Sequence, residues 1–204
     1  MFGDSTGPQS ACATPLELLL TPPRRERADA ARNRAAVLRA AGRLFAEHGV
    51  AAVSMDQVAA AAGVGKGTLF RRFGDKSGLA AALLDAGDRD LQEAILHGPP
   101  PLGPGAPDRE RLAAFADAYL GYLLEHLDLV RMSETAAPGA RYRIGAYRFW
   151  HQHAALLLAG TPDPDQAAHA LLAPLAAEHV CAVLPELGEQ RLRAGLARLA
   201  RSAL

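Results

Sequence analysis

Apolar side chains recur with a helical period along most of the chain, and no stretch shows the strict alternation of a strand. The first such segment follows Asn33 and ends at Gly49. Its apolar positions follow i, i+1, i+4, i+7 and i+8, as Val37, Leu38, Ala41, Leu44 and Phe45. Residues 1–31 are rich in Gly, Pro, Ser and Thr, then in Arg and Ala, so we expect a mobile arm there. The pattern therefore predicts an all-α fold.

Two short helices follow the first one at once. Ser54, with Gln57 three residues later, has the spacing of a capping box, which predicts a helix start. Gly63 suits the left-handed end of that helix, because glycine adopts this conformation without strain. The next helix is expected at 66–73, with Leu69 and Phe73 on its inner face. Two short helices joined by a tight glycine-containing turn predict a helix-turn-helix within residues 32–77.

The rest of the chain, 78–204, has the pattern of a larger helical domain. A helix is expected from Gly78, a proline-rich loop at 98–108, and a helix in 109–127. The segment 141–160 is expected to form one helix. Asp163 and Pro164 favour a helix start, and Pro174 should kink or divide the helix that follows. The C-terminal segment ends in an apolar stripe of Leu192, Leu196, Leu199 and Ala203.

Charge is unevenly distributed along a chain whose formal net charge is zero. Residues 24–76 hold eleven basic and five acidic side chains, a net charge of +6, so the remainder carries −6. A basic module attached to an acidic body favours a polyanionic partner for the first part only.

The segment GVGKGTLFRRF, residues 63–73, places a lysine between glycines and invites comparison with a phosphate-binding P-loop. A P-loop needs G-x-x-x-x-G-K-[ST] after a strand. Here Ala60 stands where its first glycine belongs, Gly67 where the hydroxyl residue belongs, and the preceding run is helical in character. The segment instead predicts a recognition helix whose outward polar side chains enter a DNA major groove.

Residues 32–85 resemble the N-terminal domain of the TetR family of bacterial transcriptional regulators. The family pattern includes F-x-x-x-G, a T/S-x-x-x-I/V-A-x-x-A-G-V helix, a K-G-T-L-Y-x-x-F recognition helix, and K-x-x-L. The matching segments are Phe45–Gly49, Ser54–Val64, Lys66–Phe73 and Lys76–Leu79. The resemblance covers about a quarter of the chain. It implies a three-helix DNA-binding domain followed by a helical ligand-binding and dimerisation domain.

The resemblance also assigns DNA contacts to eight positions of this sequence: Ser54, Lys66, Gly67, Thr68, Phe70, Arg71, Arg72 and Lys76. Position 70 is usually tyrosine in the family, so Phe70 lacks the hydroxyl that could bind a phosphate. Gly65 stands where serine is frequent. On helical geometry we expect Arg72, together with Thr68, to contact bases, while Arg71, Lys66 and Lys76 contact phosphates.

By the same resemblance, the body binds a small-molecule effector and pairs with a second copy through its last helices. Its unusual polar and aromatic residues are candidates for the effector pocket: Tyr119, Tyr122, His126, Tyr147, Trp150 and His151. Each of them could equally be an ordinary core or surface residue. The C-terminal leucine stripe could likewise belong to the dimer interface or to the core of one chain.

No catalytic constellation, cofactor motif or metal site is expected. His151 and His153 lie two residues apart, about 200° around a helix, and so cannot share one ion. No apolar run is long enough to span a membrane, and the N-terminal LELLL stretch lacks a basic n-region, so we expect a cytoplasmic protein. Two hypotheses stand. One is a dimeric, ligand-released repressor of palindromic operator DNA; the other is a helical small-molecule-modifying enzyme with an appended basic module.

Overall fold

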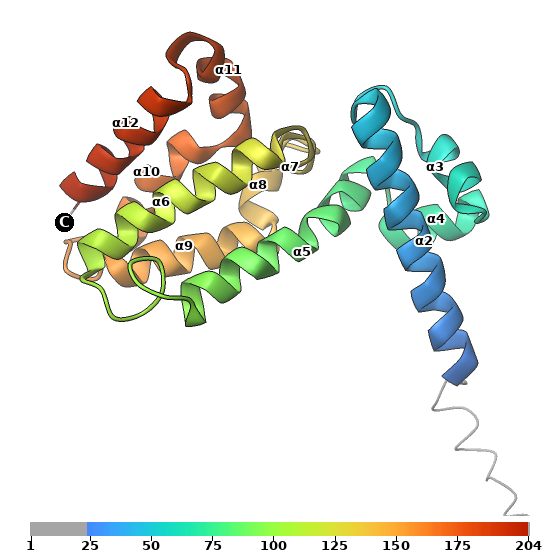
Figure 1. The fold of residues 1–204 in the computed structure, drawn as a ribbon, viewed down its shortest axis with the longest axis horizontal. Helices are drawn as coiled ribbons and strands as arrows, with labels where there is room; N and C mark the ends of the chain where they lie inside the picture. Colours follow the sequence, from blue (N-terminus) through green and yellow to red (C-terminus); the bar gives the residue numbers. More distant parts are fainter. Residues whose placement is uncertain (1–23, 204) are drawn as a thin grey trace, which may run out of the picture.

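The computed structural model describes residues 24–203, and within them the chain is entirely helical and forms two units joined by a long helix (Figure 1). The predicted arm covers residues 1–31. Residues 1–23 of it lie outside the described residues, and residues 24–31 belong to the helix that begins at Arg24. The helices are α2 (Arg24–His48), α3 (Met55–Ala62), α4 (Lys66–Phe73), α5 (Lys76–His97), α6 (Asp108–Glu125), α7 (Leu127–Glu134), α8 (Ala140–Arg143), α9 (Gly145–Leu157), α10 (Pro164–Leu172), the 3-10 turn η1 (Ala173–Leu175), α11 (Ala177–Leu187) and α12 (Glu189–Ser202).

Helices α2, α3 and α4 form the smaller unit, the helix-turn-helix domain. The capping box predicted at Ser54 is present, since its side chain accepts from the Gln57 amide and its own amide donates to the Gln57 side chain. Gly63 ends α3 in the left-handed conformation, with φ of 65°. The domain has its own apolar core, in which Val37, Val58 and Leu69 are almost completely buried.

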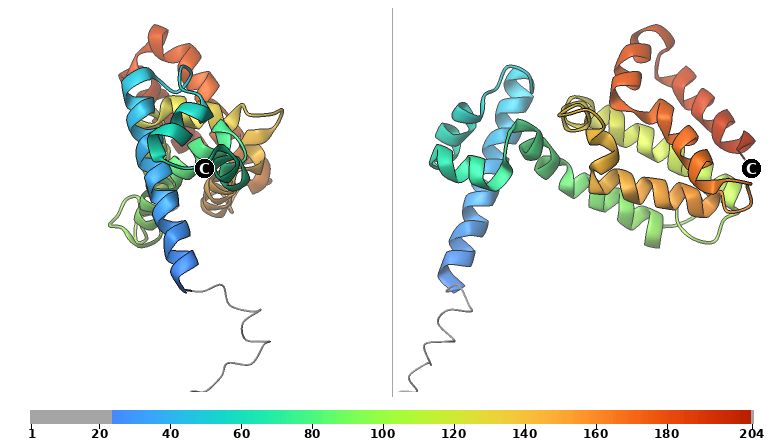
Figure 2. Two further views of the ribbon diagram at one scale, coloured as in Figure 1. Left: turned by 90° about the vertical axis from the view of Figure 1, so that its right-hand side faces the viewer. Right: turned by 180° about the vertical axis from the view of Figure 1, so that it is seen from behind.

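Helix α5 leaves this domain and runs along the larger unit, the helical body (Figures 1 and 2). The Asp75 side chain caps it by accepting from the Gly78 amide at 2.9 Å. The core of the body is a second apolar cluster, centred on Phe115, Leu120 and Trp150. Helix α7 contacts both cores: Leu129 packs against each of them, and Met132 packs against the core of the helix-turn-helix domain.

Two helical segments of the body are interrupted, one against the prediction and one in agreement with it. The expected helix at 141–160 is divided at Ile144, whose ψ of 135° is extended, into α8 and α9. Gly145 follows the break, and glycine disfavours helix interiors, which makes the interruption inexpensive. The division predicted at Pro174 is confirmed, because the proline lies in η1 between α10 and α11. The apolar periodicity of the sequence predicted neither the break at Ile144 nor α7 as a separate helix.

The C-terminal stripe is divided between the core of this chain and its surface. Helix α12 packs along α6, and its Leu192 and Leu196 are buried in the body core. Leu199 on the same helix is 40% exposed. The buried leucines therefore stabilise the single chain, and only the outer positions of α12 are free to contact another molecule.

No single helix within residues 24–203 has both the length and the apolar character needed to cross a membrane. Within the same residues, the segments Pro164–Leu175 and Ala177–Leu187 together reach that length and apolar character, but the chain bends by 53° between them.

A buried histidine on α9 should make the body sensitive to acid. His153 lies edge-on to Phe115, and its Nε2 atom has no hydrogen-bond partner among residues 24–203. Burial lowers the pKa of His153 to about 4. In the unfolded chain this histidine takes up a proton near pH 6.5, whereas in the folded chain it does so only near pH 4. The free energy of unfolding is therefore highest above pH 6.5 and decreases as the pH falls toward 4. Between pH 7 and pH 5 the loss should be about 2 kcal/mol. Urea unfolding of the wild type and His153→Gln should show a smaller loss in the variant, and equal losses would contradict this assignment.

Candidate functional site

The recognition helix α4 presents a mainly exposed outer face. Leu69 is buried beneath it, while Lys66, Gly67, Phe70, Arg71 and Arg72 are exposed and Thr68 is half-buried. Seen from behind, α3 and α4 lie in front of α2 (Figure 2). Gly65 precedes α4 without a side-chain cap, so the first amides of the helix stay available to an anion. Phe70, 44% exposed, offers an apolar surface where the family usually has a hydroxyl.

Lys66 already has an anionic partner on the same surface. Its Nζ lies 2.5 Å from Oδ2 of Asp56, in the first turn of α3, and both side chains are mostly exposed. A phosphate that binds Lys66 must therefore compete with a carboxylate. An exposed pair of this kind contributes little to stability, so its main consequence is for what Lys66 can bind.

The two adjacent arginines of α4 are in different environments. Nη1 of Arg72 donates a hydrogen bond of 2.7 Å to the carbonyl oxygen of Ala30, in the N-terminal part of α2. Arg71 makes no hydrogen bond or ion pair within the part of the chain that the structure describes. Arg72 must therefore break a protein contact to contact a base, whereas Arg71 need not. The geometry favours the reverse of the roles that helix spacing predicted.

Lys76 bonds the backbone of its own chain. Its Nζ donates to the carbonyl oxygens of Val50, Ala51 and Val53 at 2.9, 3.1 and 2.9 Å. An ammonium group has three protons, and all three are used here. Lys76 thus links α5 to the connection between α2 and α3, and its role as a phosphate contact, for which these bonds would have to break, stays a prediction. Ser54 is exposed but uses its hydroxyl in the α3 cap.

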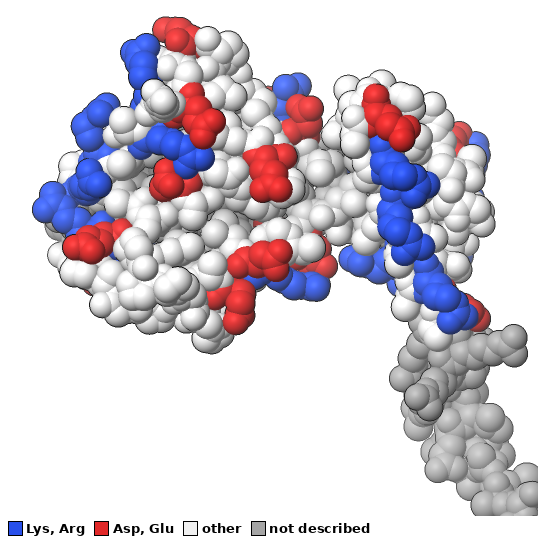
Figure 3. Space-filling view, viewed as in Figure 1, with Lys and Arg blue, Asp and Glu red and all other residues white. Residues whose placement is uncertain are grey.

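Basic charge gathers on the helix-turn-helix domain. Arg32, Arg39 and Arg43 are exposed and recur at i, i+7 and i+11, and Figure 3 shows a basic stripe along α2. Acidic and basic groups alternate over the visible face of the body instead. The basic part of the predicted charge separation is thus visible on the surface of the smaller unit, where it suits a polyanion.

The body encloses a small cavity of about 30 Å³ between α5, α6, α7 and α9. Four of the predicted effector residues line it: Tyr119, Tyr122, Tyr147 and Trp150. Leu84, Asp88, Val130, Ser133, Glu134, Ile144 and Ala146 complete the wall. The volume is enough for about one water molecule, so any larger ligand requires the helices to move apart.

The two predicted histidines do not line this cavity. His126 contacts the outer edge of Tyr122 and borders a groove between the body and the helix-turn-helix domain. His151 lies against His169, with ring centroids 4.1 Å apart, and His169 Nδ1 is 2.8 Å from the Tyr147 hydroxyl. The spacing along α9 turns His151 away from Trp150, because adjacent residues differ by about 100°.

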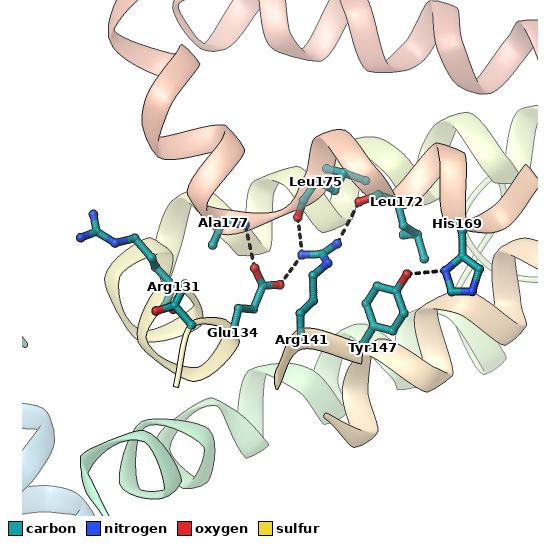
Figure 4. Close-up of polar contacts among 9 residues, drawn as sticks. Arg131, Glu134, Arg141, Tyr147, His169, Leu172, Leu175 and Ala177 are labelled. Carbon is teal, nitrogen blue, oxygen red and sulfur yellow. Dashed lines mark hydrogen bonds and ion pairs between the residues drawn. The ribbon is translucent and has the colours of Figure 1, made fainter. Parts of the chain in front are cut away.

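Glu134, in the cavity wall, forms a buried ion pair with Arg141, and the two side chains together contact α10, η1 and α11 (Figure 4). Arg141 bonds the Glu134 carboxylate and also donates to the carbonyl oxygens of Leu172 and Leu175 at 2.8 and 3.1 Å. The other Glu134 oxygen accepts from the Ala177 amide at 2.8 Å. Burial raises the pKa of Glu134, and Arg141 opposes that shift. The pair links α7 and α8 to the junction of α10, η1 and α11.

Sequence reasoning missed Asp56, Asp88 and Arg141. Asp88 could have been found from the sequence. It lies four residues after Leu84 and seven before Ile95, so it places a charged side chain on the otherwise apolar face of α5. Asp56 and Arg141 had none, since their partners lie ten and seven residues away in non-periodic positions.

Comparisons with known proteins agree with this architecture. Residues 37–83 match the profile of the family described as bacterial regulatory proteins, tetR family. HTH-type transcriptional regulators of Staphylococcus aureus strains USA300 and NCTC 8325 are 42% identical to the chain over 71 residues, 35% of this chain. The matched region spans 37% of those curated relatives.

Solved structures resemble the chain over most of its length. A TetR-family transcriptional regulator from Pectobacterium atrosepticum is 28% identical, with a TM-score of 0.60 over 85% of this chain and 93% of that one. A Rhodococcus sp. protein assigned to the TetR family shares the fold, at 19% identity and a TM-score of 0.60 over 85% of this chain and 98% of that one. Residues 37–83 therefore match the helix-turn-helix domain of the tetR family of bacterial regulatory proteins, and the chain as a whole is similar in fold to the TetR-family regulator from Pectobacterium atrosepticum.

Proposed function

We propose that this chain is a ligand-responsive transcriptional regulator, most simply a repressor, that binds palindromic operator DNA as a homodimer in the cytoplasm. The observation that carries the proposal is the exposed, positively charged α4 of a helix-turn-helix domain matched to the family. The relatives of this chain are regulators by description, which favours this function over the helical enzyme considered from the sequence.

The coupling between effector and DNA would pass through α5 and α7. Asp88 of α5 and Val130 of α7 line the cavity, while Leu129 and Met132 of α7 pack against the core of the helix-turn-helix domain. A ligand that enlarges the cavity must displace at least one of the four helices around it, and a displacement of α5 or α7 would reach the helix-turn-helix domain. It releases DNA only if it binds the DNA-free arrangement more tightly, and a coupling of roughly 1–3 kcal/mol changes operator affinity about 5–150-fold.

A gel-shift experiment with the DNA upstream of the chain's own coding region tests the function directly. We expect binding to a discrete palindromic site in excess random DNA, with two recognition helices about 34–36 Å apart. Binding that is equally tight to random DNA at all salt concentrations would refute an operator-specific regulator. If the upstream DNA is not bound, the operator could lie elsewhere in the genome. In that case a selection from random oligonucleotides should still enrich a particular sequence.

The dimer is proposed to form through the outer faces of α11 and α12. A groove of about 480 Å³ lies there, with Pro174, Leu187 and Leu199 among its lining residues. Leu199→Glu should convert dimer to monomer in analytical ultracentrifugation and weaken operator binding in the same step. The matched control is Leu156→Glu, because Leu156 is 67% exposed on α9, outside this groove. An unchanged dimer in Leu199→Glu would exclude this interface.

A further inference from the structure

The cavity in the body contains one carboxylate that lacks a cationic partner. Asp88 and Glu134 both line it, but Glu134 is neutralised by Arg141. Asp88 forms no ion pair with a lysine or arginine within residues 24–203. Burial raises the pKa of Asp88, and the nearby Tyr122 hydroxyl and His126 oppose this shift. The wall therefore has an excess of negative charge located at Asp88.

Aromatic rings surround this carboxylate. Tyr119 stacks on Tyr122 with ring centroids 6.2 Å apart, and the Trp150 ring is tilted against Tyr119 with centroids 5.4 Å apart. The buried Tyr122 hydroxyl lies near Asp88 but makes no hydrogen bond of normal geometry in the part of the chain that the structure describes. Ring faces attract cations through their quadrupoles, and a buried hydroxyl without a partner favours a ligand that supplies one.

We propose that this cavity binds an organic cation, with its ammonium group held against the rings of Tyr119, Tyr122 and Trp150 and paired with Asp88. The inference rests on the proposed function and names the chemical class of its effector. A neutral or anionic ligand would leave the Asp88 charge uncompensated and so fits this wall less well.

Entry of such a cation requires α5 to move. The cavity of about 30 Å³ is smaller than a methylated ammonium group, and α5 lies very close to α6 at this point. A Cβ atom added at Gly87 would be 3.0 Å from Cε2 of Tyr122, so glycine permits this close approach. An occupied cavity pushes α5 outward, and α5 begins directly after α4. Cation binding and the position of the recognition helix are therefore linked.

Tryptophan fluorescence of the full chain tests the site without DNA. Trp150 is the single tryptophan, and it is 1% exposed in the cavity wall. Tetramethylammonium, choline and benzyltrimethylammonium serve as cations, and 3,3-dimethylbutan-1-ol is the neutral isostere of choline. We expect a saturable change with at least one cation and, for choline, at least about tenfold weaker binding of its isostere. Asp88→Asn should weaken cation binding by about tenfold, and Asp90→Asn, an exposed charge on the same helix, should not.

Equal binding of choline and its isostere, an unchanged affinity in Asp88→Asn, or no saturable response to any of the three cations would each overturn the cation site. Adding operator DNA separates this result from the proposed function. Saturable cation binding without release of DNA would support the site and refute its regulatory role. Release of DNA by neutral ligands alone would support regulation and refute the cationic class.

Discussion

Replacing Arg141 by methionine should destabilise the folded chain by about 3–5 kcal/mol, the usual cost of removing one partner of a buried ion pair. The variant leaves the Glu134 carboxylate buried without its counter-charge. It also removes the donors to the Leu172 and Leu175 carbonyl oxygens. Methionine retains most of the side-chain volume, so the loss reports on charge and hydrogen bonding rather than on packing. Urea unfolding followed by circular dichroism measures it.

Two further variants make this result specific. Arg148→Met removes an exposed arginine from α9 and should change the stability by less than about 0.5 kcal/mol. The double variant Arg141→Met with Glu134→Gln keeps an acceptor for the Ala177 amide and removes the stranded charge, so it should recover part of the loss. If Arg141→Met lowers the free energy of unfolding by less than about 1 kcal/mol, Arg141 is not essential to the junction of α7, α8 and α10.

The helix-turn-helix domain was predictable because its signals are local. The cap at Ser54, the left-handed Gly63 and the buried Leu69 each follow from residues within one or two helical turns. The all-α class followed in the same way, since apolar periodicity is a property of single helices. Pro174 also acts locally, and its division of the helix was predicted correctly.

The site details depended on contacts between distant segments and could not be predicted in this way. Lys76 looks like a free cation in sequence, yet it binds carbonyl oxygens more than twenty residues earlier in the chain. Arg72 likewise bonds Ala30, forty-two residues away. Spacing along one helix gives the direction of a side chain but not its partner, so the roles that we propose for Arg71 and Arg72 rest on the tertiary structure.

Truncating Arg71 and truncating Lys66 should weaken DNA binding in different ways. Arg71 is exposed in the last turn of α4, where a guanidinium can bond guanine O6 and N7 together. Arg71→Ala should therefore cost about 1–3 kcal/mol on the preferred sequence and flatten the sequence preference. Lys66→Ala should weaken all sequences about equally and reduce the salt slope by roughly one. Fluorescence anisotropy with specific and random duplexes over a range of salt concentrations measures both effects.

Asp56→Asn supplies a control of opposite sign to Lys66→Ala. The Asp56 carboxylate lies 2.5 Å from the Lys66 ammonium and competes with phosphate for it. Neutralising Asp56 should strengthen binding to every sequence, most clearly at low salt, because the freed lysine and the lost negative charge both favour DNA. If Asp56→Asn weakens binding, Asp56 positions Lys66 rather than competing for it.

Arg72→Ala should resemble Lys66→Ala if Arg72 contacts only phosphate and α2. If Arg72→Ala flattens the sequence preference instead, the bond to Ala30 breaks on DNA and Arg72 is the base-contacting arginine.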